Sequence, residues 1–116
     1  MEKTTFNIIE ATIEEIQQAF AAKQLTSVEL VQLYLDRIEQ IDKNGPKINS
    51  VLTVNPDVLK IAEELDTLRG QDGQGPLYGI PVLVKDNIDT TDDMPTTAGT
   101  IALQENYAMV DSFVAM

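Results

Sequence analysis

The sequence contains no cysteine and no histidine, and it has few basic residues. Without the first two residue types, the chain has no disulfides, thiolate nucleophiles, Cys or His zinc sites, or Ser-His-Asp triad of its own. Eight Lys and Arg against 19 Asp and Glu give a net charge of −11, which argues against nucleic-acid and anionic-membrane partners. Any general base must therefore be Lys, Asp, Glu or Tyr.

Long hydrophobic runs are also missing. No apolar stretch approaches the roughly 20 residues that a membrane span needs, and the N-terminus lacks a hydrophobic signal core. We therefore expect a cytoplasmic protein. The 116 residues are enough for about one small domain, and 43% apolar with 23% charged residues is typical of globular chains.

Three helices are predicted from start signals that precede apolar stripes. Thr12-Ile13-Glu14-Glu15 and Thr26-Ser27-Val28-Glu29 are both capping boxes, in which the glutamate reaches back to the amide of the threonine. The second helix should end near Asn44-Gly45-Pro46, since Gly favours a C-cap and Pro forbids continuation. Asn55-Pro56-Asp57 opens a third helix, which should end near Arg69-Gly70. Such helices are usually scaffold.

Two short apolar runs are strand candidates, Val51–Val54 and Ile80–Val84. The second is apolar on successive residues, a pattern typical of a strand buried on both faces, and it ends at Lys85. Open α/β sheets place their chemistry at the ends of such strands. Lys85 is therefore a candidate catalytic lysine; the alternative is a strand-end lysine that extends into water. A last helix is predicted to start at Asp111-Ser112.

The loops offer weaker candidates. Residues 70–76 are expected to form a surface loop and not a phosphate cradle, because no lysine-serine pair and no helix follow them. The acidic stretch after Lys85 resembles a calcium loop superficially, but the EF-hand order fails, which favours a solvated loop over a metal site. The hydroxyl-rich segment Met94–Gly99 is either an ordinary connection or a loop that brings backbone amides near a ligand.

Taken together, these residues resemble the amidase signature family. The segment from Gly75 to Asn87 is similar to the lysine-bearing motif of that family, and the similarity continues through Met94–Gly99 and Asp111–Val114. The N-terminal part, residues 26–52, is similar as well, so the resemblance covers nearly the whole chain. The resemblance implies an α/β fold, in which residues 1–116 supply the N-terminal helices and first strands of a single mixed-sheet amidase domain that is incomplete here.

The family also implies a mechanism. Its members hydrolyse or transfer amides with a serine nucleophile, a second serine on a cis peptide bond, and a lysine base, which corresponds to Lys85. Burial of a lysine favours its neutral form, so the apolar run before Lys85 suits a base. Asp86 and Asn87 are expected to orient Lys85 or pin its turn, and Thr96, Thr97 and Gly99 to contribute one wall of the substrate pocket. No metal and no cofactor are expected.

The serines of the family motif are not found in this chain. Ser27, Ser50 and Ser112 lack a glycine-rich setting, and the family's Gly/Ser-rich stretch lies downstream of Met116. We therefore expect an N-terminal fragment that is inactive alone, with a small-molecule amide as substrate and the missing C-terminal portion as partner. The alternatives are part of the A subunit of a glutamyl-tRNA amidotransferase, or a noncatalytic interaction module derived from the amidase front end.

Overall fold

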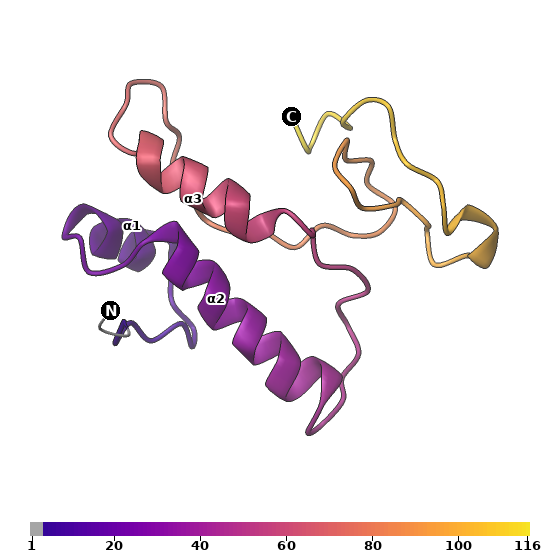
Figure 1. Cartoon of the computed structure of the whole chain (residues 1–116), viewed down its shortest axis with the longest axis horizontal. Helices are drawn as coiled ribbons and strands as arrows, with labels where there is room; N and C mark the ends of the chain where they lie inside the picture. The colour runs from indigo at the N-terminus through magenta and orange to yellow at the C-terminus, as the bar shows by residue number, and fades with distance from the viewer. Residues whose placement is uncertain (1–3) are drawn as a thin grey trace. The chain divides into compact units, whose positions relative to one another are not determined.

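The computed structural model describes residues 4–116, which divide into two compact units. The helical unit comprises residues 4–48 and 59–81, and the loop unit comprises residues 49–58 and 82–116. Figure 1 shows that the labelled helices lie in the first two thirds of the chain.

Both capping-box helices are confirmed. α1 spans Ile13–Ala21 and α2 spans Ser27–Arg37, and each is preceded by a threonine N-cap. The Thr12 amide donates to Glu15 Oε2 at 2.7 Å, and the Thr26 amide donates to Glu29 Oε2 at 2.8 Å. The glutamate amides return the contact to the threonine hydroxyls at 3.1 Å in both helices. Local sequence thus fixes both helix starts.

α2 continues without a break into η1, a π-helix over Ile38–Lys43. The Asn44 amide donates to the Glu39 carbonyl at 3.1 Å, which is the i→i+5 pattern of this wider helix. Gly45 then adopts a φ of +53°, so the predicted end near Asn44-Gly45-Pro46 is confirmed.

The third helix, α3, spans Val58–Leu68, as predicted from its start and stop signals. Asn55 Oδ1 accepts the Asp57 amide at 3.0 Å, and the Asn55 carbonyl accepts the Val58 amide at 3.1 Å. Figure 1 shows α2 and α3 running in opposite directions, with the end of α3 near the start of α2. Asp66 of α3 links the two helices: its carboxylate accepts hydrogen bonds from the amides of Ser27 at 2.7 Å and Val28 at 3.0 Å, in the first turn of α2.

The core of the helical unit lies between α1 and α2. Five apolar residues are almost fully buried there: Ile16, Ala19, Phe20, Leu25 and Leu30. Ile80, from the segment before Lys85, packs against this cluster and is itself partly buried. Tyr34 of α2 packs against it as well. The segment that leads to Lys85 is thus fixed to the helical core up to Ile80.

The predicted strands are not formed within residues 4–116. Val51–Val54 and Ile80–Val84 are irregular, and η2, a 3-10 helix over Ile101–Leu103, is the regular element of the loop unit beyond residue 58. Residues 82–84 make no hydrogen bond to the described residues and are 65%, 83% and 43% exposed. A strand exists only through its ladder with a neighbour, and the described residues supply none. The mixed-sheet part of the fold prediction is therefore not confirmed.

The predicted helix at Asp111-Ser112 is wrong for this structure. Residues 113–115 form a turn, in which the Ala115 amide donates to the Ser112 carbonyl at 2.9 Å. So short a segment cannot meet the cost of helix nucleation without packing, and Phe113 and Val114 are exposed. Across residues 4–116, no helix has the length and apolar composition to cross a membrane.

Candidate functional site

Lys85 lies at the first position of a tight turn in the loop unit. Its carbonyl accepts the Ile88 amide at 3.0 Å, which closes the turn over residues 85–88. The Lys85 side chain is exposed, and among the described residues its ammonium makes no hydrogen bond or ion pair. Val82–Val84 are exposed too. The sequence pattern predicted that this apolar run would bury the lysine, and in this chain it does not.

Asp86 joins this turn to the hydroxyl-rich segment Met94–Gly99, which we call the threonine loop. Its carboxylate accepts the Thr97 amide at 3.1 Å through Oδ1 and the Thr97 hydroxyl through Oδ2. Its backbone carbonyl accepts the Ala98 amide at 2.8 Å. The Thr97 hydroxyl and then the Thr97 amide lower the pKa of the Asp86 carboxyl; desolvation opposes them, and the Gly99 amide adds a lesser lowering effect. The ionised carboxylate is thus the form that this contact favours.

The threonine loop is held by further contacts of its own backbone. Thr96 is buried, its amide donates to the Asn106 carbonyl at 2.8 Å, and its carbonyl accepts Asn106 Nδ2 at 3.0 Å. The Gly99 amide donates to Thr97 Oγ1 at 3.1 Å. The three residues predicted to line a substrate pocket, Thr96, Thr97 and Gly99, therefore lie together on one fixed loop beside Asp86.

Asn87 and Asn106 have different surroundings in this unit. Asn87, expected to help orient Lys85, is exposed, and its side chain makes no hydrogen bond to the described residues. Asn106, which the sequence analysis did not single out, is the residue that holds Thr96. A lone asparagine in an irregular segment carries no pattern from which this pairing could be predicted.

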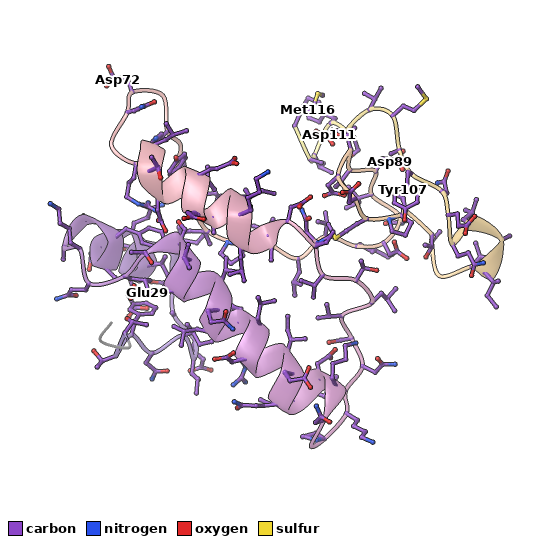
Figure 2. All side chains as sticks on the ribbon, viewed as in Figure 1. Glu29, Asp72, Asp89, Tyr107, Asp111 and Met116 are labelled. Carbon is purple, nitrogen blue, oxygen red and sulfur yellow. The ribbon has the colours of Figure 1, made fainter. Side chains whose placement is uncertain are left out.

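A second carboxylate–threonine contact holds the other end of the loop unit. The Thr91 amide and hydroxyl donate to Asp111 Oδ1 at 2.7 and 3.0 Å, and the Ser112 amide donates to the Asp89 carbonyl at 3.0 Å. Figure 2 shows Asp89 and Asp111 on the loops of this unit. Asp92 Oδ1 accepts the Thr90 hydroxyl at 2.8 Å. The acidic residues thus hold loops together, and residues 4–116 contain no cluster of three that could bind a metal ion.

The helical unit contains a polar cluster that was not predicted from the sequence. Arg69 donates to Asp66 Oδ1 at 3.0 Å and to the Ser27 hydroxyl, and its guanidinium lies 3.9 Å from the centre of the Phe20 ring. Partial burial alone would raise the pKa of Asp66, but the amides of Ser27 and Val28 together with Arg69 outweigh it and lower the pKa. An Asp-Arg pair three residues apart at the end of a helix was the available signal.

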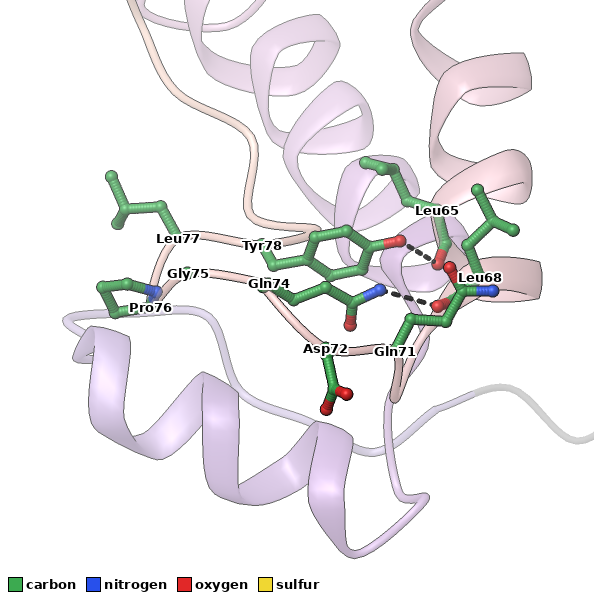
Figure 3. Close-up of a pocket in the computed structure, with 10 residues that line it drawn as sticks. Leu65, Leu68, Gln71, Asp72, Gln74, Gly75, Pro76, Leu77 and Tyr78 are labelled. Atoms are coloured by element: carbon green, nitrogen blue, oxygen red, sulfur yellow. Dashed lines mark hydrogen bonds between the residues drawn. The ribbon is translucent and has the colours of Figure 1, made fainter.

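The loop over residues 70–76, predicted to lie at the surface, forms the rim of an open pocket at the end of α3 (Figure 3). Gln74 Nε2 donates to the Leu68 carbonyl at 2.6 Å, and the Tyr78 hydroxyl donates to the Leu65 carbonyl at 2.8 Å. The lining is mainly apolar, and its charged residue is Asp72. A lining with one carboxylate and no cation does not suit a phosphate, and the pocket does not include Lys85.

The serines present do not have the setting of a nucleophile, which the family places in a glycine-rich stretch. Ser27 is fully buried and accepts a hydrogen bond from Arg69, and the Ser112 hydroxyl is enclosed. Ser50 is exposed but lies in a segment without a glycine-rich turn. These positions give no Ser-Lys pair with Lys85.

Comparison with known proteins places these residues in a family. The sequence profile of the Amidase family matches residues 29–116. A probable amidase of Arabidopsis thaliana is 47% identical over 96% of this chain and 22% of its own length. From Maridesulfovibrio salexigens, the A subunit of the glutamyl-tRNA(Gln) amidotransferase is 38% identical over 90% of this chain and 21% of its own length.

Solved structures agree. An amidase family protein from Bacillus anthracis superposes with a TM-score of 0.87 at 40% identity, over 92% of this chain and 21% of that one. The peptide amidase of Stenotrophomonas maltophilia superposes with a TM-score of 0.78 at 44% identity, over 84% of this chain and 20% of that one. The chain spans about a fifth of the length of these relatives. With its Lys85-bearing segment inside the matched region, the chain belongs to the amidase family.

Proposed function

We propose that this chain supplies the lysine of an amidase that hydrolyses carbon–nitrogen amide bonds by a Ser-cisSer-Lys mechanism. The observation that carries the proposal is the position of Lys85. It lies in the segment matched to the Amidase family, on a closed turn, with an ammonium that the described residues leave unpaired. A lysine that is not held in an ion pair is free to contact the bridging serine that the mechanism requires.

In the proposed reaction, neutral Lys85 accepts a proton through a bridging serine, and a second serine attacks the amide carbonyl. The C–O bond of an acyl-enzyme forms, the C–N bond breaks, and the amine leaves with a proton. Water then hydrolyses the acyl-enzyme. Both serines are assigned to the four fifths of the relatives' length that this chain does not span, so residues 1–116 alone are expected to be inactive.

The neighbouring residues have supporting roles in this proposal. The segment from Thr96 to Gly99 forms one wall of the amide pocket, because contact with Asp86 holds it beside the Lys85 turn. Asp86 holds the turn, and Asn87, which is exposed, is available to contact a segment outside this chain. The proposed partners are a small-molecule amide and the C-terminal portion of the enzyme, in the cytoplasm, without metal, cofactor or nucleic acid.

A second candidate is the A subunit of a glutamyl-tRNA amidotransferase, which the 38% identity to such a protein supports. The higher identity to the Arabidopsis amidase, 47%, favours the plain amidase. Both candidates assign the same role to Lys85.

The proposal is tested with a chimaera in which this chain replaces the aligned fifth of the Stenotrophomonas peptide amidase. We expect the chimaera to release ammonia from a peptide amide, and the 116-residue chain alone to release none. The matched control is the same amidase with the aligned segment deleted. A folded chimaera that is no more active than this control would contradict the proposal.

A further inference from the structure

Lys85 lies in the loop unit, whose residues 49–58 and 82–116 form no β-sheet. Residues 82–84 are exposed and make no hydrogen bond to the described residues, so the approach to Lys85 from the N-terminal side is unsupported within the unit. Within the unit, the contacts that fix the Lys85 backbone therefore lie on its C-terminal side. Asp86, the next residue, is where such contacts are made.

We propose that Asp86 and Thr97 form a clasp that positions Lys85, which makes both of them positioning residues of the amidase site. The inference rests on the proposed function of Lys85. The side chain of Asp86 holds the amide and hydroxyl of Thr97, and its carbonyl holds the Ala98 amide. Asp86, which follows Lys85, is thus hydrogen-bonded to Thr97, eleven residues further along the chain. The Lys85 carbonyl accepts the Ile88 amide and closes the turn.

The polar groups of Thr97 are fully used in this arrangement. Its amide and hydroxyl protons both go to Asp86, and its hydroxyl oxygen accepts the Gly99 amide. A threonine hydroxyl has one proton to donate, so Thr97 has no donor left for a substrate. Thr97 therefore acts on the reaction through the Lys85 turn, and its side chain does not need to contact the amide.

The backbone of the clasp carries strain that supports a functional reading. Ala98 adopts a φ of +49°, in the left-handed region that disfavours residues with a Cβ atom. Such a conformation persists only where surrounding contacts impose it, and the Ala98 amide bond to Asp86 is one of these contacts. Loss of the Thr97 contacts should let the loop relax and move the Lys85 turn.

The first test uses the 116-residue chain and needs no activity. Hydrogen exchange is measured at the Ile88 amide, which reports the Lys85 turn. Thr97→Val should raise its exchange rate about tenfold, and Thr97→Ser, which keeps the hydroxyl, should not. Thr91→Val is the matched control, because Thr91 makes the same kind of contact with Asp111 at the other end of the unit. Equal Ile88 exchange in the Thr97→Val and unsubstituted chains would overturn the clasp.

The second test uses the chimaera. A displacement of about 1 Å at a catalytic group lowers rates roughly 100-fold, so Thr97→Val should lower kcat by about that factor with little change in KM. Thr97→Ser should restore kcat, and Thr91→Val should leave it unchanged. Asp86→Ala with Thr97→Val should cost no more than Asp86→Ala alone, since loss of the Asp86 carboxylate already breaks the hydroxyl contact that Thr97→Val removes.

The outcomes distinguish a failure of the proposed function of Lys85 from a failure of the Asp86–Thr97 clasp. Activity that does not depend on Lys85 contradicts the proposed function, while the exchange measurement still decides whether the clasp exists. A rise in KM with unchanged kcat for Thr97→Val would overturn the positioning role and would indicate that Thr97 binds the substrate. A loss of kcat in Thr91→Val equal to that in Thr97→Val would also overturn it, since the effect would then be general loosening of the unit.

Discussion

Gly79 is the position where one added methyl group tests the packing of the helical unit. It is buried, its φ is +75°, and a Cβ atom would lie 2.6 Å from Arg69 Nη2 and closer still to Ser27 Oγ. Arg69 cannot simply move aside, because it bonds to Asp66 at 3.0 Å and lies 3.9 Å from the Phe20 ring centre. Gly79→Ala therefore adds backbone strain and forces apart a fixed cluster.

The expected loss in the free energy of unfolding follows from the backbone strain and the overpacking. A left-handed conformation costs an alanine about 1–2 kcal/mol, and overpacking a fixed site costs about 1–3 kcal/mol. Gly79→Ala should thus lower the free energy of unfolding by about 2–5 kcal/mol, a large share of the roughly 5–15 kcal/mol of a typical domain.

Two other glycines separate the effects. Gly73 has a φ of +85° with nothing within 4 Å of a built Cβ atom, so Gly73→Ala should cost only the strain, about 1–2 kcal/mol. Gly75 is outside the left-handed region and equally open, so Gly75→Ala should be neutral or slightly stabilising.

The assay is urea unfolding followed by circular dichroism at the helical minimum. Ser27→Ala in the Gly79→Ala background should recover part of the loss, because it removes the nearest atom. If Gly79→Ala proved no more destabilising than Gly73→Ala, the Arg69–Ser27 cluster would not be packed as described.

Two further stability predictions concern helix starts. Asp66→Asn should cost about 1 kcal/mol near neutral pH, because the carboxylate caps α2 through Ser27 and Val28. The folded-state pKa of Asp66 lies below its ordinary value of 3.8, so its contribution is complete above that pH and is lost as the pH falls through the lowered pKa. Melting temperatures of the two chains should therefore converge in acid, and a constant difference at all pH values would refute the assignment to the carboxylate. Thr26→Ala, which removes a capping hydroxyl, should cost about 1 kcal/mol in urea unfolding, with Thr26→Ser as the control that keeps the cap.

The helices were predictable because their signals are local. Thr12 and Thr26 meet their glutamates three residues later, and Asn55 meets Asp57 two residues later. The same locality placed Lys85 at a turn, although the turn follows an irregular segment and no strand. Nearby residues thus determine where each helix begins and where the chain turns.

The rest depends on partners that are distant in sequence. Asp66 lies 39 residues from Ser27, and Thr97 lies 11 residues from Asp86. No periodicity connects such pairs. A strand at Ile80–Val84 requires a neighbouring strand, which the described residues do not provide, and burial of Lys85 likewise requires a covering surface.

The most direct test of the central claim is kcat for Lys85 variants of the chimaera. Lys85→Ala should lower kcat by orders of magnitude without loss of fold, and Lys85→Arg should fail as badly, because arginine keeps the charge but cannot give up its proton. Lys60→Ala, at an exposed position of α3, is the control and should leave kcat unchanged. Near-normal kcat in Lys85→Arg would mean that Lys85 supplies charge alone, and near-normal kcat in Lys85→Ala would contradict any catalytic role.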